Sequence, residues 1–182
     1  MIALITGGSG CGKSTFAEKL VDTLPGENRI YLATMQVMDD ESRQRVERHR
    51  RQRAGRGFVT VEREKGLGEV QLPQQPIVLL EDLVNLVANE MFGGGDVGRI
   101  PGDLEKLARN CRHLIMVTND VFSDGVTYPP SVEEYLRCLS AVNMRAAGMA
   151  DLVTEVVYSI PVVLKGALPW EIGQEGIRWE TR

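Results

Sequence analysis

Residues 2–20 read IALITGGSGCGKSTFAEKL, and this stretch decides the fold. A short apolar run ends in a cluster of glycines, and apolar side chains then recur at helical spacing from Phe16 onwards. Between them, residues 7–14 satisfy the pattern G-x-x-x-x-G-K-[ST] in the context that it requires, after a strand and before a helix. Glycines there let successive backbone N–H groups converge on phosphate oxygens, next to the positive end of the helix. The stretch therefore predicts a phosphate-binding loop.

The predicted loop supplies both phosphate contacts and one ligand for a metal ion. Lys13 is expected to reach the β- and γ-phosphates of a nucleoside triphosphate, and the hydroxyl of Ser14 to bind Mg²⁺. An acidic ligand is expected at the end of a neighbouring buried strand, and IVLLED at residues 77–82 offers Glu81 and Asp82. Glu81 comes directly after the apolar segment, so we expect it to bind the metal; the alternative is that both acids merely end a strand. The expected phosphate-binding residues are Gly7, Gly8, Ser9, Gly10, Cys11, Gly12, Lys13 and Ser14.

The rest of the chain alternates between apolar runs and amphipathic segments. Strands are predicted at residues 2–6, 29–34, 58–62, 77–80 and 113–120, helices at 14–24, 83–92, 102–112 and 131–150, and a hairpin or strand pair at 152–166. Strands that are apolar throughout and alternate with helices indicate an α/β protein with a mostly parallel sheet covered on both faces. We therefore expect a P-loop NTPase fold of the RecA-like type, with helices flanking the sheet, a C-terminal strand pair and one domain over residues 1–182.

Composition and charge are those of an ordinary globular protein. The chain has 182 residues, of which 43% are hydrophobic and 25% charged, and its formal net charge of −4 argues against general affinity for nucleic acid. No apolar run is long enough to span a bilayer, and the amino terminus has no signal-peptide pattern. Three cysteines at unrelated spacings argue against a disulfide framework or a zinc site. These observations predict a cytoplasmic protein.

An arginine-rich segment interrupts this acidic sequence at residues 43–56, RQRVERHRRQRAGR, where seven arginines surround His49. Its residues up to Arg53 include a single aliphatic one, Val46, so we predict a helix that lies largely in solvent. On such a helix Arg45 and Arg53 lie one turn to either side of His49, and cations there disfavour the charged form of its imidazole. A neutral imidazole beside groups that grip polyphosphate is suited to attack phosphorus. The alternative, which spacing alone leaves equally open, is a solvated helix with an incidental histidine.

Several motifs together resemble one family. In order and spacing they are similar to those of the adenosylcobinamide kinase/adenosylcobinamide-phosphate guanylyltransferases of cobalamin biosynthesis. The matching motifs are TGGSGCGKSTFAE, YLAT, DDESRQRVERHRRQR, FVTVE, LLEDLVNLVANEMF, VTNDV and VNMRAAGMAD followed by VLKG. The likeness extends to about Gly166, and residues 167–182 are an uncertain tail. Gly10 and Cys11 stand where the family usually has arginine and serine.

The resemblance implies a bifunctional enzyme. Members of this family phosphorylate the aminopropanol hydroxyl of adenosylcobinamide with a nucleoside triphosphate, here ATP or GTP. They then attack the α-phosphate of GTP with a histidine and pass the GMP to the cobinamide phosphate. The matching nucleophile is His49, and the implied partners are the corrinoid, the nucleotides with Mg²⁺, and further copies of the chain in a homo-oligomer, a trimer in the family. The nucleotide contacts that the resemblance implies beyond the loop are Ala33, Thr34, Met35, Arg50, Arg51, Gln52, Arg53, Glu62 and Glu81.

Two other functions fit parts of the sequence. In the first alternative the chain is a different P-loop small-molecule kinase, in which the arginine-rich helix covers the phosphates and His49 has no catalytic role. A nucleotide-dependent RNA-binding module would use the same arginines, but the aromatic residues expected for base stacking are not interleaved with them.

Other residues are expected to have structural roles. His113 precedes an apolar run and is expected to be the residue at which a strand begins. Trp170 and Trp179 are expected to cover apolar surface. Asn119 and Asp120 follow a predicted parallel strand, where α/β sheets bind ligands, although a plain polar strand end is equally compatible with the sequence.

Overall fold

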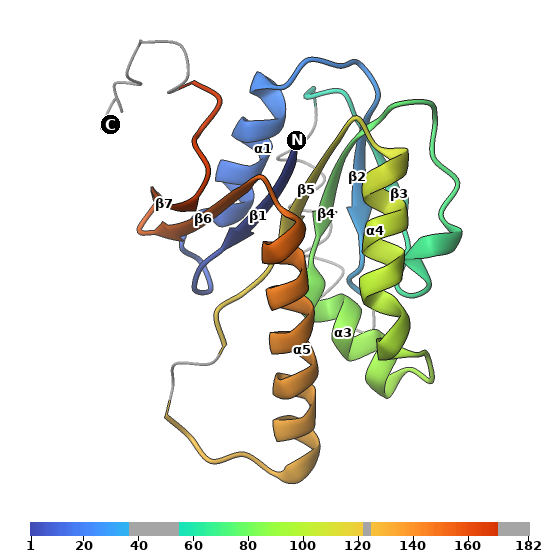
Figure 1. The fold of residues 1–182 in the computed structure, drawn as a ribbon, viewed down its shortest axis with the longest axis vertical. Helices are drawn as coiled ribbons and strands as arrows, with labels where there is room; N and C mark the ends of the chain where they lie inside the picture. Colours follow the sequence, from blue (N-terminus) through green and yellow to red (C-terminus); the bar gives the residue numbers. More distant parts are fainter. Residues whose placement is uncertain (37–54, 122–124, 171–182) are drawn as a thin grey trace.

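The computed structural model describes residues 1–36, 55–121 and 125–170, and a seven-stranded sheet organises them. The sheet order is β3-β2-β4-β5-β1-β6-β7, and every neighbouring pair is parallel except β6 and β7, which form an antiparallel hairpin (Figure 1). The strands are β1 (Ile2–Thr6), β2 (Arg29–Ala33), β3 (Phe58–Glu62), β4 (Ile77–Glu81), β5 (His113–Val117), β6 (Leu152–Val157) and β7 (Ile160–Lys165). The predicted fold class, a mostly parallel sheet with a C-terminal strand pair, is confirmed.

Helices cover both faces of the sheet. α1 packs on one face, and α3, α4 and α5 pack on the other (Figure 1). The helices are α1 (Lys13–Thr23), α3 (Leu83–Phe92), α4 (Ile100–Asn110) and α5 (Pro130–Met149), with 3-10 turns η1 (Leu67–Glu69) and η2 (Val97–Arg99). A proline stands in the first turn of both α4 and α5, where the missing N–H has no intrahelical partner to lose.

Alternation of side chains along the strands builds a separate core on each face. In β1, Leu4 packs with α3, α4 and α5, whereas Ala3 and Ile5 pack with α1. The central strands β4 and β5 are buried on both faces, which is why they read as continuous apolar runs in the sequence. Packing on both faces holds the strands in place. Because β1 to β6 run parallel, the carboxyl ends of these strands share one edge of the sheet.

A few boundaries differ from the prediction. α4 begins at Ile100, two residues before the predicted start, because Pro101 is accommodated in the first turn. The strand predicted at 113–120 ends at Val117, and the N–H of Asp120 bonds to the carbonyl of Gly7 at 3.2 Å, so the chain turns toward the phosphate-binding loop. His113 is the first residue of β5, as predicted. The predicted arginine-rich helix lies outside the described residues.

The segment after β7 returns over α1. Leu168 is buried in the core on that face, and the ring of Trp170 stands edge-on to Phe16 with 6.0 Å between ring centroids. Trp170 therefore covers apolar surface, as predicted, and Trp179 lies outside the described residues. In the part of the chain that the structure describes, no helix has the length and apolarity needed to cross a membrane.

Candidate nucleotide-binding site

The predicted phosphate-binding loop joins β1 to α1 at the carboxyl edge of the sheet. Gly10 and Gly12 have φ angles of 70° and 95°, in the left-handed region that glycine adopts without strain. Gly7 is required for a second reason, since a Cβ there would lie 2.5 Å from the carbonyl oxygen of Val156 in β6. The glycines thus let the backbone curl tightly against the neighbouring strand.

Lys13 lies folded over this loop. Its side chain is largely buried, and its ammonium group donates a hydrogen bond to the carbonyl of Gly8 at 3.0 Å. The buried amine therefore stays inside the curl of the loop, where the glycine-rich backbone is suited to present N–H groups to phosphate. The predicted role of Lys13, which is to neutralise the β- and γ-phosphates, requires an ammonium group within this loop.

Ser14, at the end of the loop, is hydrogen-bonded to Glu81 of β4. The hydroxyl of Ser14, in the first turn of α1, donates to Oε1 of Glu81. Glu81 is the last residue of β4 rather than the first beyond it, and its place in the alternation puts its side chain on the α1 face of the sheet, with Leu79. The hydroxyl of Tyr31 donates to the other carboxylate oxygen, Oε2, at 3.0 Å. The carboxylate is thereby held on both sides.

The donor atoms at this point fit Mg²⁺. A hydroxyl and a carboxylate are hard oxygen ligands, and Mg²⁺ is usually held by one or two carboxylates together with substrate phosphates and water. Within the described ranges there is no group of three or more His, Cys, Asp or Glu side chains that could hold a metal by themselves. A magnesium ion here would be held by Ser14 and Glu81 and completed by the nucleotide, and it would neutralise phosphate charge.

Thr34 ties the end of β2 to the start of α3. Its buried hydroxyl donates to the carbonyl of Asp82 at 2.7 Å and accepts from the N–H of the same residue at 2.8 Å. Asn89 of α3 donates to the carbonyl of Thr34 at 2.7 Å. Asp82 caps α3 by accepting from the N–H of Asn85 at 2.7 Å, and burial raises the pKa of this carboxyl, with the charge of Glu81 adding to the effect. Asp82 is thus occupied as a helix cap, while Glu81 is the acid that faces the loop.

Other predicted contacts lie in one row at the carboxyl edge. Ala33 is paired in register with Glu62 on one side and with Glu81 on the other. Met35 follows directly after Thr34 on the same edge. The structure therefore aligns Ala33, Glu62 and Glu81 along the carboxyl edge of the sheet, with β3 four positions from β1, the strand that leads into the loop. His49 and the contacts expected at Arg50, Arg51, Gln52 and Arg53 lie outside the described residues.

Sequence reasoning missed three side chains at this site. Tyr31 was not predicted, although its place two residues before Ala33 in a strand puts both side chains on one face. Asn89 gave no signal, because its role depends on how α3 packs against the end of β2. Asn143 of α5 also gave none; its side-chain oxygen accepts a hydrogen bond from Thr118, just beyond β5, at 2.9 Å.

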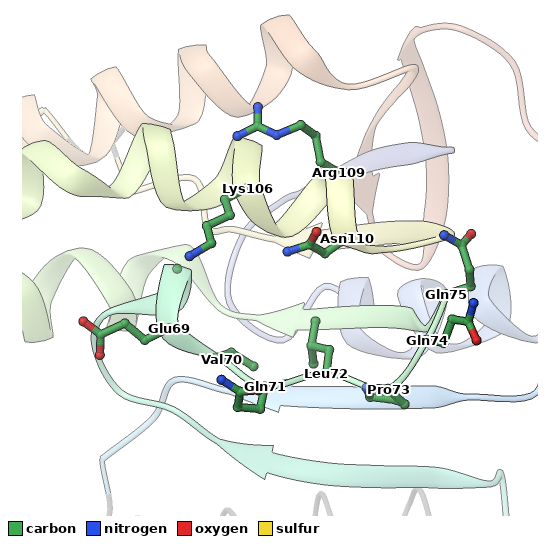
Figure 2. A pocket seen from close by; sticks show the side chains of 11 residues that line it. Glu69, Val70, Gln71, Leu72, Pro73, Gln74, Gln75, Lys106, Arg109 and Asn110 are labelled. Carbon is green, nitrogen blue, oxygen red and sulfur yellow. The ribbon is translucent and has the colours of Figure 1, made fainter.

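A separate cavity of about 630 Å³ lies between α4 and the loop that leads to β4. Figure 2 shows Lys106, Arg109 and Asn110 on the helix side and Glu69 to Gln75 along the loop. Gln74, Gln75 and Asn110 stand just before the amino ends of β4 and β5, at the edge of the sheet opposite the phosphate-binding loop. This cavity is therefore separate from the nucleotide site.

A glycine loop follows a central parallel strand, and Lys13 folds into that loop. Glu81, from a nearby strand, faces Ser14 of the loop. These features define a P-loop nucleotide-binding protein of the α/β class. The chain belongs to the cobinamide kinase / cobinamide phosphate guanyltransferase family, which matches residues 3–164. These are enzymes of adenosylcobalamin biosynthesis.

Two curated relatives are similar over their full length. The bifunctional adenosylcobalamin biosynthesis protein CobU of Escherichia coli is 31% identical over 185 residues, which cover 91% of this chain and 100% of the relative. The protein of the same name from Salmonella typhimurium is 30% identical, with the same shares covered.

Two solved structures show similarity to this chain at low sequence identity. The flagellar accessory protein FlaH of Methanocaldococcus jannaschii matches 91% of this chain and 78% of its own, with 13% identity and a TM-score of 0.49. A KaiC-like protein of Pyrococcus horikoshii matches 85% of this chain and 71% of its own, with 16% identity and a TM-score of 0.40.

Proposed function

We propose that this protein phosphorylates adenosylcobinamide with ATP or GTP and then transfers GMP from GTP to the resulting phosphate, giving adenosylcobinamide-GDP. Membership of the cobinamide kinase / cobinamide phosphate guanyltransferase family supports both activities. The observation that carries the proposal is the hydrogen bond between Ser14 and Glu81, next to the glycine loop that contains Lys13. This arrangement is suited to bind a nucleoside triphosphate together with its metal ion.

In the kinase step the chain acts by positioning and by charge. The N–H groups of residues 8–14 receive the phosphates, and Lys13 neutralises the β- and γ-oxygens. Ser14 and Glu81 would hold Mg²⁺, which would withdraw charge from the phosphate oxygens. The substrate hydroxyl oxygen then forms a bond to the γ-phosphorus, the bond from that phosphorus to the β-phosphate oxygen breaks, and the hydroxyl proton leaves.

In the guanylyl transfer, His49 is the nucleophile. A ring nitrogen forms a bond to the α-phosphorus of GTP, the bond to the bridging oxygen of the β-phosphate breaks, and pyrophosphate leaves. An oxygen of the cobinamide phosphate then attacks the same phosphorus, and the nitrogen–phosphorus bond breaks. Arg50, Arg51, Gln52 and Arg53 would grip the phosphates, since guanidinium groups bind phosphate in a bidentate manner. Ala33, Thr34, Met35 and Glu62 would contact the nucleotide from the carboxyl edge of the sheet.

Labelling of the protein by GTP tests the proposal. Wild-type protein incubated with Mg²⁺ and GTP labelled at the α-phosphate should gain a label that is lost in acid and kept in alkali. The His49→Ala variant should gain none, yet should still transfer a γ-phosphate to adenosylcobinamide. The Lys13→Ala variant should lose the γ-phosphate transfer. A label that persists in His49→Ala, or no label on wild-type protein, would contradict the assignment of the nucleophile.

We also propose that the chain acts in the cytoplasm as a homo-oligomer, which the family resemblance implies to be a trimer. Apolar side chains exposed on the C-terminal hairpin support the assembly. Ile160, Val162 and Leu164 of β7 are 63%, 44% and 59% exposed, and they lie on the face opposite Val163, which packs in the α1-side core. Contiguous exposed apolar surface of this kind commonly marks a contact with another protein.

A further inference from the structure

A tight turn joins β6 to β7 beside the phosphate-binding loop. The paired strand ends leave only Tyr158 and Ser159 between them. The N–H of Ser159 donates to the carbonyl of Cys11 at 2.8 Å, and a Cβ at Gly12 would lie 2.6 Å from the hydroxyl oxygen of Ser159. The turn is therefore seated directly on the loop that receives the phosphates.

A tyrosine is an unusual residue at position 158, because the backbone of this turn is left-handed there. Its φ is 49° and that of Ser159 is 66°, so both residues are left-handed, as in the type I′ turns that favour Asn and Gly. Residues with a Cβ disfavour that conformation. The side chain of Tyr158 is also 89% exposed, so its ring gains little by burial on folding. Within residues 1–36, 55–121 and 125–170, neither turn geometry nor packing explains a tyrosine here, and its exposed ring could meet a ligand.

The metal ligands fix the direction in which a nucleotide lies. A metal ion held by Ser14 and Glu81 would neutralise the terminal phosphates, so the γ end of the nucleotide would point toward these two residues. Glu81 belongs to β4, which lies on one side of β1 in the sheet, whereas β6 and β7 lie on the other. The nucleoside end is therefore directed away from Glu81, toward the turn that carries Tyr158.

We propose that the ring of Tyr158 stacks on the base of the nucleoside triphosphate that donates its γ-phosphate. This inference rests on the proposed function, because it requires the phosphates of the donor to lie in the loop. Stacking on an aromatic ring accepts any base, which fits a donor that is either ATP or GTP. The contacts assigned to guanylyl transfer, at Thr34 and Glu62, lie beyond Glu81 on the opposite side. The kinase and guanylyl-transfer steps then hold their bases at different places.

Calorimetric titration with two ligands, each with Mg²⁺, tests the stacking. The ligands are AMP-PNP, which has a base, and inorganic tripolyphosphate, which has none. The informative variant is Tyr158→Asn, because asparagine favours the left-handed conformation and should leave the thermal midpoint at or above that of wild type. Its Kd for AMP-PNP should rise on the order of tenfold, while its Kd for tripolyphosphate stays unchanged. Tyr158→Phe keeps the ring and should bind both ligands as wild type does.

Three results would overturn the inference. Equal weakening of both ligands in Tyr158→Asn would mean that the loop itself was disturbed. Unchanged binding of AMP-PNP, with a lower mass by light scattering, would assign Tyr158 to a contact between subunits instead. If wild-type protein bound neither AMP-PNP nor tripolyphosphate, the proposed function would be overturned as well. This outcome is distinct from the other two because it is measured on wild-type protein alone.

Discussion

Each oxygen of the Glu81 carboxylate contacts a different hydroxyl, Oε1 that of Ser14 and Oε2 that of Tyr31. The ring of Tyr31 is buried and stands edge-on to Phe58, with 6.4 Å between ring centroids, so its hydroxyl has little freedom to move. Tyr31 is therefore a positioning residue: it holds the carboxylate so that the remaining oxygen faces α1.

Removal of that hydroxyl should weaken metal binding. In Tyr31→Phe the carboxylate loses one hydrogen bond to a charged acceptor, and the Mg²⁺ concentration at half-saturation should rise by about three- to tenfold in the presence of AMP-PNP. Calorimetric titration of the metal into the nucleotide-bound protein measures this without turnover. Tyr135→Phe is the matched control, because the hydroxyl of Tyr135 donates to the backbone carbonyl of Val84 at 3.2 Å and should leave metal affinity unchanged. Equal metal affinity in Tyr31→Phe and wild type would refute the positioning role.

At the scale of elements, the end of β2 and the start of α3 are joined through one buried hydroxyl. Thr34 both donates to and accepts from the backbone of Asp82, and Asn89 fixes the carbonyl of Thr34 from α3. The strand end that carries Ala33 and the helix that begins after Glu81 are thus held together as one unit. The proposed nucleotide contacts on β2 and β4 depend on this junction for their spacing.

Thr34→Val should break the junction. Valine has a similar shape but leaves the N–H and the carbonyl of Asp82 without this partner in a buried place, which should lower the free energy of unfolding by about 1–3 kcal/mol. Urea denaturation followed by circular dichroism measures the loss. Thr34→Ser keeps the hydroxyl and should retain most of the stability. A Thr34→Val variant that is as stable as wild type would show that these hydrogen bonds do not stabilise the junction.

Elements of the central sheet could be predicted from the sequence because their patterns are local. β4 and β5 are apolar apart from Glu81 and His113 at their ends, and α3 was predicted at its observed bounds from its apolar pattern and the glycines that follow it. The phosphate-binding loop was predicted for the same reason, as its glycines and lysine are contiguous. The register that aligns Ala33, Glu62 and Glu81, and the contact of Ser159 with Cys11, join distant segments and leave no local pattern to detect.

At the scale of the whole molecule, the two edges of the sheet differ. The edge strand β7 carries three exposed apolar side chains in alternate positions, Ile160, Val162 and Leu164. β3, at the opposite edge, exposes Val59 by 61%. We expect the β7 edge to be covered in the proposed homo-oligomer.

A charge on β7 should shift assembly. Val162→Lys places an ammonium group in the centre of the apolar face, where burial between chains would cost its solvation. The mass by light scattering at micromolar concentration should therefore fall toward that of one chain, 20.2 kDa. Val59→Lys makes the same chemical change on β3 and should leave the mass unchanged. A mass that does not fall in Val162→Lys would show that this face is not the contact.

The place of β1 between β5 and β6 has a consequence for protein synthesis. The strand β1 and the loop after it leave the ribosome before the partners of β1 in the sheet, which begin more than a hundred residues later at Leu114 and Leu152. Nascent chains that end before the C-terminal hairpin lack the strand and the turn on which the loop rests. Nucleotide binding measured on stalled nascent chains of increasing length would therefore show at which length the C-terminal hairpin completes the site.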